Sequence, residues 1–222
     1  MSVFLSESEI KAVVRASLIQ KEGLFTSARG SGEGSVQTKT GKSEDGLGDL
    51  ALMPDDSTSV NAIHPDFWKV VDKIQRKLNS AEGGGFKSKI GSGYRSAKSQ
   101  QEKIDKGYSK SPHLIGWHTS LNADGSRAAY AVDLVHKEAG WSETKKAYDF
   151  FEALGKIVNS DEFKDVITWG GNWEPKAKTI EGKTYTIGWD PAHIQWKKIT
   201  RAQIEKNTLA GIEKIKSSRA VS

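Results

Sequence analysis

The clearest strand signal in the chain is the segment AAYAVDLV at residues 128–135, which carries one carboxylate, Asp133, inside an otherwise apolar run. Burying a carboxylate without a partner is costly, so a fold that buries this strand has to place a cation or hydrogen-bond donors beside Asp133. The preceding segment, SPHLIGWHTSLNADGSR at 111–127, contains two histidines, His113 and His118. We therefore expect the fold to bring Asp133 together with a histidine and a cation.

The chain has 222 residues, of which 36% are hydrophobic and 27% charged, and this suits one globular domain with extensions better than two full domains. The absence of cysteine excludes disulfides, thiolate metal sites and cysteine nucleophiles. No apolar run approaches membrane-spanning length, and the first residues lack the basic start and apolar core of a signal peptide. We expect a monomer that does not insert into a membrane.

The formal net charge of +5 fits either an ordinary basic protein or one attracted to a polyanion such as nucleic acid or an anionic cell wall. Lysine and arginine are spread along the chain, without a dense basic block or an RNA-binding pattern of interleaved aromatic residues. Nucleic acid is therefore not an expected partner.

Three regions differ in character. Residues 1–60 begin with a predicted helix at 6–20 and continue as a segment rich in glycine, serine and threonine, which we interpret as a linker or a long irregular loop. Residues 61–200 have the regular apolar patterns of a folded domain. Residues 201–222 predict a basic terminal helix or tail.

The pattern of the central region predicts an α+β fold, with a small antiparallel sheet flanked by helices. A turn is expected at 122–125, where Asn, Asp and Gly gather, and residues 170–182 are expected to form a loop. The expected helices begin at Pro65, Ser96 and Ser142, and the expected strands lie at 86–94, 128–135, 165–169, 183–189 and 190–196.

Without cysteine, only histidine, aspartate and glutamate can hold a transition metal. Candidate ligands are His113 in SPHLIG, Asp133 in AVDLV and His193 in DPAHIQW. Two histidines and one carboxylate leave one position of a tetrahedral zinc ion open for water, as a hydrolytic site requires. The alternative is that these histidines are unrelated surface or core residues.

Several motifs occur in an order that resembles a known enzyme family. SPHLIG and AVD match the pattern Ser-x-His-x-x-Gly followed by Ala-x-Asp, WGGNW resembles WGGDW, DPAH resembles a closing DxxH, and GYRSAKSQ resembles a GYR…Q segment. Together these motifs cover about residues 85–198. They resemble the zinc D-alanyl-D-alanine carboxypeptidases and L-alanyl-D-glutamate endopeptidases, a group that includes VanY-like enzymes and bacteriophage endolysins.

The resemblance implies a zinc ion in a cleft over the sheet, held by His113, Asp133 and His193. It implies that Asp190 is the general base. Without the resemblance, Asp190 can be explained as a turn residue before a proline.

The other implied site residues contact substrate. Arg95 is expected to bind a substrate carboxylate or to polarise the scissile carbonyl, with a surface salt bridge as the alternative. Gln100 and Ser111 are expected to support substrate or to orient other side chains.

The implied function is cleavage of peptidoglycan stem peptides, with the L-Ala–D-Glu bond as first choice and D-Ala–D-Ala carboxypeptidase activity as the alternative. We expect a phage endolysin, made in the host cytoplasm and acting on the cell wall after release, or a lysin carried in the virion. In the second case residues 1–60 would contact the phage particle. The competing hypothesis is a non-catalytic structural or wall-binding protein that retains the fold.

The chain departs from the family pattern between its first histidine and Asp133, where it has an extra segment. A hairpin turning at 122–125 would absorb the insertion, bring the His113 region beside Asp133 and place His118 opposite about residue 129. This favours His113 as the ligand, whereas His118 is closer to Asp133 in sequence and is the alternative. Asn172 also stands where the family often has aspartate.

Overall fold

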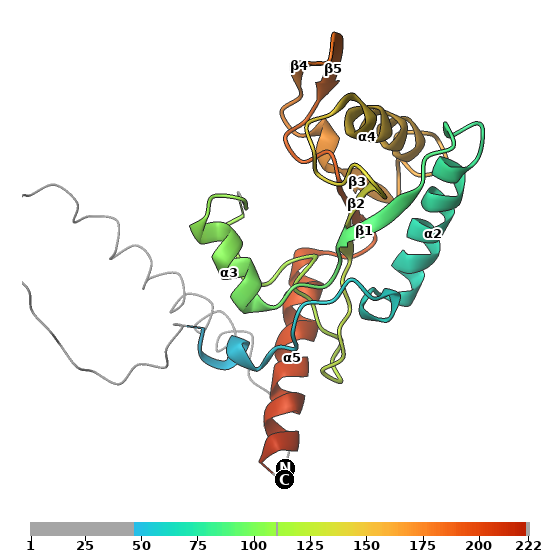
Figure 1. Cartoon of the computed structure of the whole chain (residues 1–222). Helices are drawn as coiled ribbons and strands as arrows, with labels where there is room; N and C mark the ends of the chain where they lie inside the picture. The colour runs from blue at the N-terminus through green and yellow to red at the C-terminus, as the bar shows by residue number, and fades with distance from the viewer. Residues whose placement is uncertain (1–46, 110, 221–222) are drawn as a thin grey trace, which may run out of the picture. The chain divides into compact units, whose positions relative to one another are not determined.

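The computed structural model describes residues 47–109 and 111–220. The fold is α+β, as the sequence predicts, and the described part contains four α-helices, a four-stranded antiparallel sheet and a separate β-hairpin (Figure 1). The helix expected at 6–20 lies outside the described residues. Among the helices that are described, none combines the length and apolar character needed to cross a bilayer.

The central sheet has the strand order β1-β2-β6-β3, and every neighbouring pair is antiparallel. Its strands are β1 (Ser88–Ser92), β2 (Ala131–His136), β3 (Ile167–Trp169) and β6 (His193–Trp196). In this register Asp133 lies opposite Ser92 on one side and His193 on the other. Both edges of β2 and of β6 are therefore paired, and β2, whose six residues are all buried, is the more enclosed of the two strands.

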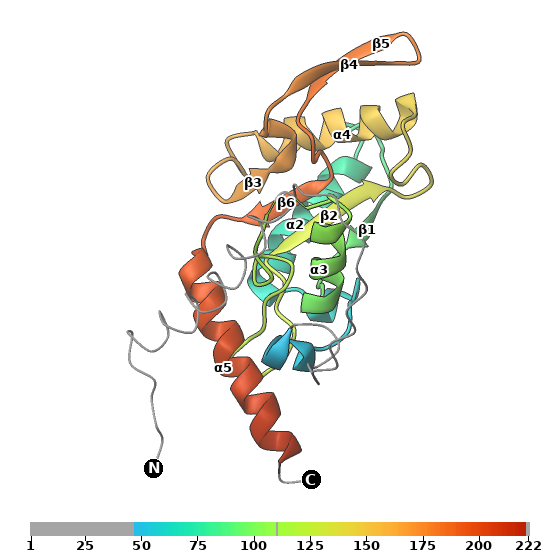
Figure 2. The ribbon, with the colours of Figure 1, turned by 90° about the vertical axis from the view of Figure 1, so that its left-hand side faces the viewer.

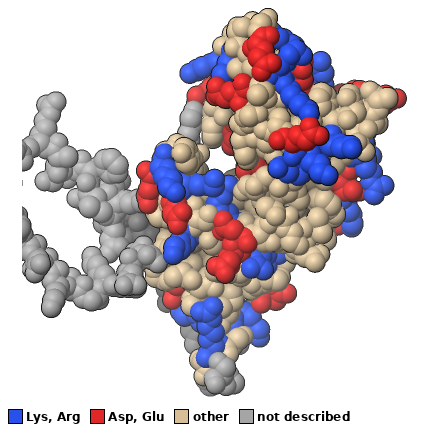
Figure 3. All heavy atoms as spheres, in the orientation of Figure 1, with Lys and Arg blue, Asp and Glu red and all other residues tan. Residues whose placement is uncertain are grey.

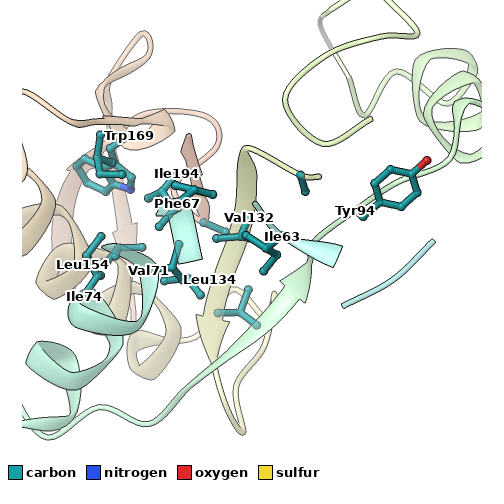
Figure 4. Packing of buried hydrophobic residues seen from close by; sticks show 14 of the residues in the cluster. Ile63, Phe67, Val71, Ile74, Tyr94, Val132, Leu134, Leu154, Trp169 and Ile194 are labelled. Carbon is teal, nitrogen blue, oxygen red and sulfur yellow. The ribbon is translucent and has the colours of Figure 1, made fainter. Parts of the chain in front are cut away.

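Helices α2 (Pro65–Asn79) and α4 (Lys145–Val158) cover one face of this sheet. Figure 4 shows the side chains of Phe67 and Val71 packed against Val132, Leu134 and Ile194. Successive side chains of a strand point to opposite faces, so Asp133 and His193 project from the other face. The alternation that turns Val132 and Leu134 into the core therefore turns Asp133, which lies between them, toward the opposite face of the sheet.

The helix starts follow the expected capping chemistry with one correction. His64 accepts a hydrogen bond from the Asp66 backbone N–H at the start of α2. The Ser96 side chain caps helix α3 (Ala97–Asp105), as predicted, by accepting a hydrogen bond from the Ser99 N–H. Helix α4 is capped by Thr144, two residues after the expected Ser142, because the Thr144 hydroxyl reaches the Ala147 N–H.

Helix α3 lies over the second face of the sheet, in front of β1 and β2 in Figure 2, with α2 behind them. The last helix, α5 (Arg201–Arg219), starts with a capping box between Thr200 and Gln203. Its Thr208 hydroxyl accepts a hydrogen bond from the Leu121 N–H at 3.1 Å. This bond attaches the turn at 122–125 to α5.

Residues 47–60 pack with the folded domain. They include the 3-10 helix η1 (Gly48–Leu52), and a second one, η2 (Val60–Ala62), follows. The Asp49 carboxylate forms a salt bridge with Lys216 of α5 at 2.9 Å. The backbone of Ser57 forms an isolated antiparallel β-bridge with Tyr94.

A hairpin of β4 (Lys176–Ile180) and β5 (Lys183–Ile187) stands apart from the central sheet, at the top of Figure 1. The expectation of a loop at 170–182 is therefore wrong for β4. The strand was missed because its first four residues are all exposed, so it has no alternating apolar pattern. Its two-residue turn places Glu181 and Gly182 at positive φ, as a type I′ turn requires.

Asp149 of α4 anchors the hairpin. Its Oδ1 accepts hydrogen bonds from Lys183 and from the Tyr185 hydroxyl, both at 2.8 Å, and its Oδ2 accepts one from Lys145 at 2.6 Å. Burial alone would raise the pKa of Asp149, but these donors lower it to about 2. The ionised carboxylate is thus bound more strongly in the folded state than in the unfolded chain.

We expect Asp149→Ala to lower the free energy of unfolding by about 1–2 kcal/mol at pH 7, because Lys183 is partly exposed and solvent screens part of the interaction. The folded pKa lies below the ordinary value, so the stabilisation is present above about pH 4 and is lost as the pH falls through 2. Urea unfolding at pH 7 and pH 3 measures both effects. Asp161→Ala, at an exposed ion pair with Lys164, is the control and should change the free energy of unfolding little. Equal losses in the two variants would contradict the anchoring role of Asp149.

Candidate metal centre

Three buried side chains from separate segments meet on the second face of the sheet: His118, Asp133 and His193. Asp133 and His193 are placed by the pairing of β2 with β6, where they lie directly opposite each other. His118 comes from the loop before β2, and its backbone carbonyl accepts a hydrogen bond from the Arg95 N–H at 2.8 Å. The two strands and this backbone bond together fix the cluster.

The three candidate ligand atoms form a nearly equilateral triangle. His118 Nε2 lies 3.2 Å from His193 Nδ1 and 3.3 Å from Asp133 Oδ1, and the third side is also 3.3 Å. In a tetrahedral site with metal–ligand distances of about 2.0–2.1 Å, ligand atoms are about 3.3–3.4 Å apart. The triangle therefore has the size of one face of a zinc coordination tetrahedron, and its residues fit that ion.

Hydrogen bonds outside the triangle set the tautomer of each histidine. His118 Nδ1 lies 2.7 Å from the Gly93 carbonyl oxygen, which can only accept, so the proton is on Nδ1 and the Nε2 lone pair faces the cluster. His193 Nε2 lies 3.0 Å from Gln195 Oε1, which leaves the Nδ1 lone pair facing the cluster. Both rings are thus oriented as metal ligands.

The charge states suit a cation. Burial lowers the pKa of His118, which favours the neutral ring that binds metals. Burial alone would raise the pKa of Asp133, but the neighbouring His118 and His193 hold it well below its usual range. Burial alone would lower the pKa of His193, but the hydrogen bond and charge of Asp133 raise it, so a metal ion would have to displace a proton from this ring. Two imidazole nitrogens and one carboxylate converge, and this donor set is typical of a catalytic zinc site.

His113, the histidine expected in this cluster, lies outside it. His118, the alternative ligand, lies beside Asp133 and His193 instead. The turn at 122–125 forms as predicted, and pairing runs outward from the Leu121–Arg127 bridge to a hydrogen bond between the Tyr130 N–H and the Trp117 carbonyl. The pairing cannot extend to His113, because both edges of β2 are already occupied by β1 and β6.

Arg95 and Gln100 lie beside the cluster and bind each other. Arg95 is only 8% exposed, which rules out the surface salt bridge. It donates to Gln100 Oε1 at 2.7 Å and to the Ser92 hydroxyl at 3.0 Å, and its Nη2 lies 3.7 Å from Asp133 Oδ2. Ser111, by contrast, is exposed, and its hydroxyl accepts from the His113 N–H at 3.4 Å.

Asp190 lies in the turn that leads into β6, three residues before His193, and its carbonyl accepts a hydrogen bond from the His193 N–H at 3.2 Å. The WGGNW segment holds this turn: Trp169 Nε1 donates to the Pro191 carbonyl at 2.8 Å. A β-carbon at Gly170 would come within 2.3 Å of the Asp190 carbonyl oxygen, so only glycine allows this approach. Burial, and then the charge of Asp133, raise the pKa of Asp190 to about 6.

The tryptophans divide between core and cleft. Trp169 is buried in the core, whereas Trp173 packs on the ring of His193 with 5.1 Å between centroids. Trp189 packs on Trp173 at 5.4 Å and is 40% exposed. These two rings form a wall beside the cluster.

No protein-family model and no curated protein matches the chain. Among solved structures, it is similar to the crystal structure of the Serratia marcescens L-Ala D-Glu endopeptidase ChiX, with 23% sequence identity and a TM-score of 0.40. The match covers 68% of this chain and 95% of ChiX. At this degree of similarity, functional conclusions have to come from the side chains of the site.

Gln195 was missed in the sequence, although its position two residues after His193 on a strand places both side chains on one face. We expect Gln195→Leu to weaken zinc binding about 10–100-fold, because it removes the acceptor that fixes the His193 tautomer. Gln195→Glu keeps an acceptor and should stay close to the wild type. Competition with a fluorescent zinc chelator measures both affinities, and equal affinities of Gln195→Leu and wild type would contradict this role.

Proposed function

We propose that the chain is a zinc-dependent peptidase that hydrolyses the stem peptides of peptidoglycan. The observation that carries this proposal is the triangle of His118 Nε2, Asp133 Oδ1 and His193 Nδ1, with both histidine lone pairs directed into it. These three residues would hold the ion, with His118 in place of His113. A bound zinc ion supplies a Lewis acid that lowers the pKa of water to about 7.

Asp190 is the proposed general base. It lies next to the cluster in sequence and space, and its pKa of about 6 lets it accept a proton from water near neutral pH and then pass the proton to the leaving amine. The hydrogen bond from the His193 N–H fixes the backbone of Asp190 next to a proposed ligand, which keeps the carboxylate near the cluster.

Arg95 is the proposed electrostatic group. Gln100 and Ser92 hold its guanidinium on the same side as Asp133, where a positive charge can stabilise a developing oxyanion or bind a carboxylate of the substrate. Gln100 acts through Arg95, because its Oε1 accepts from Arg95 and its Nε2 donates to Ser109. Exposed Ser111 remains a proposed substrate contact.

The proposed substrate bond is L-Ala–D-Glu, because the DPAH and WGGNW motifs resemble the endolysin branch of the family. D-Ala–D-Ala carboxypeptidase activity is the second candidate within the class. An endolysin or a virion-associated lysin is the proposed setting, and the N-terminal extension, residues 1–60, is the proposed point of contact with a particle.

Zinc content and hydrolysis test this proposal together. Elemental analysis should find one zinc ion per chain, and the protein should release new amino groups from purified peptidoglycan until a chelator is added. Restoring zinc should restore release. A protein that binds no zinc and stays inert on peptidoglycan with zinc added would instead support a non-catalytic wall-binding role.

A further inference from the structure

A cavity of about 300 Å³ lies beside the proposed catalytic residues, between the β4–β5 hairpin and the start of α4. Trp189 and Pro191, the two neighbours of Asp190, line its inner end. The steps proposed for hydrolysis do not use it. Its volume is at the lower end of the range for small-molecule sites, so it suits one ring-sized group rather than a long chain.

Trp189 gives the cavity an aromatic surface that packs against a second ring. The Trp189 N–H donates to the Trp173 carbonyl at 3.2 Å, and the Trp189 ring packs on the Trp173 ring, which in turn packs on His193. A β-carbon at Gly188 would lie 2.4 Å from the Trp173 carbonyl oxygen, so the backbone is close-packed there. The position of this indole is therefore coupled to that of the candidate metal centre.

The remaining lining is polar and of mixed sign. Lys178 pairs with Glu143 at 2.7 Å, and its ammonium lies 5.4 Å from the centre of the Tyr148 ring. Lys176 and Glu174 complete the charged lining. Figure 3 likewise shows Lys and Arg side chains next to Asp and Glu side chains around the hairpin. This mixture does not suit a ligand recognised by one sign of charge.

We propose that this cavity is a sugar-binding subsite that holds an amino-sugar ring of the glycan strand during cleavage of the attached stem peptide. A sugar ring has one apolar C–H face, which packs on an indole, and a rim of hydroxyl and amide groups, which bind polar side chains of both kinds. This inference rests on the proposed peptidase function and specifies its substrate as glycan-linked rather than free peptide.

The length of the substrate supports this position. In peptidoglycan the stem peptide joins the muramyl sugar through a lactyl group, so the L-Ala carbonyl is about 7 Å from the sugar, counting two residue lengths. Trp189 and Pro191 flank Asp190 in the chain and both line the cavity, so a sugar held there favours a scissile bond near the sugar, such as L-Ala–D-Glu. The D-Ala–D-Ala bond is about 17 Å or more from the sugar and is disfavoured by the same placement.

The test compares kcat/KM for an N-acetylmuramyl pentapeptide with kcat/KM for the same pentapeptide without sugar. The wild-type protein should prefer the muramyl substrate at least ~10-fold, mainly through KM, since one well-placed ring contributes about this much. Trp189→Ala should bring the ratio close to 1, and Lys176→Ala, which changes an exposed residue, should reduce it several-fold. Trp141→Ala removes another exposed tryptophan, outside the cavity lining, and should leave the ratio unchanged.

Equal wild-type rates on the two substrates, or an unchanged ratio in Trp189→Ala, would overturn the sugar subsite while leaving the peptidase function intact. If neither substrate is cut, the peptidase function fails, and titration with the disaccharide N-acetylglucosaminyl-N-acetylmuramic acid then decides. Quenching of tryptophan fluorescence that is lost in Trp189→Ala would support the sugar site, and its absence in the wild type would refute it.

Discussion

Asp190→Asn is expected to keep the fold and the bound zinc but to lower kcat about 10²–10⁴-fold, the usual contribution of a general base. Asparagine has nearly the shape of aspartate and cannot accept the proton. The hydrogen bond from the His193 N–H goes to the backbone carbonyl of residue 190, so the substitution leaves it in place. Steady-state hydrolysis of a defined stem peptide, with zinc content measured on the same sample, separates loss of the base from loss of the metal.

The pH profile gives an independent check on Asp190. The base works only when ionised, so activity should be present above its pKa and fall as the pH drops through about 6. A bound divalent cation lowers a neighbouring carboxyl pKa, which places this acid limb at pH 6 or below. The residual activity of Asp190→Asn should no longer fall at acid pH. Unchanged turnover in the variant would remove Asp190 from the mechanism.

His118→Ala is expected to lower zinc affinity by more than ~100-fold, whereas His113→Ala should retain wild-type affinity. The first change removes one corner of the ligand triangle, and losing a ligand costs more than losing a group that orients one. The second change is a matched control, because both residues are histidines of the segment that precedes β2 and only His118 lies in the cluster. Equilibrium dialysis against buffered zinc, followed by elemental analysis, measures the two affinities.

Circular dichroism should show that both histidine variants are folded. His118→Gln provides a second variant of similar size if the alanine leaves too large a cavity at this buried position. If only His113→Ala lost zinc, His118 would not be the ligand, and His113, the ligand that the motif predicts, would take its place.

Much of the site could be predicted because it depends on local patterns. The alternation in AVDLV predicts that Asp133 faces away from its apolar neighbours, and the structure places Val132 and Leu134 in the core. Asp190 and His193 follow from a compact motif with fixed spacing. The turn at 122–125 follows from its own residues and forms where expected.

The choice between the two histidines could not be made locally, because it depends on which strands occupy the edges of β2. The sequence indicates a hairpin, but its length is limited by β1 and β6, and these come from distant parts of the chain. The approach of Arg95 to Asp133 is also tertiary, since the two residues are far apart in the chain and meet through the pairing of β1 with β2. Exposed β4 was missed for a different reason: its side chains carry no burial pattern.

Mass spectrometry of the fragments released from a defined N-acetylmuramyl pentapeptide is the most direct test of the zinc peptidase proposal. Zinc-loaded protein should cut once, between L-Ala and D-Glu, and a chelator should stop the reaction. Release of the terminal D-Ala alone would assign the carboxypeptidase activity instead. Intact substrate after prolonged incubation with protein that holds one zinc ion per chain would contradict the proposal.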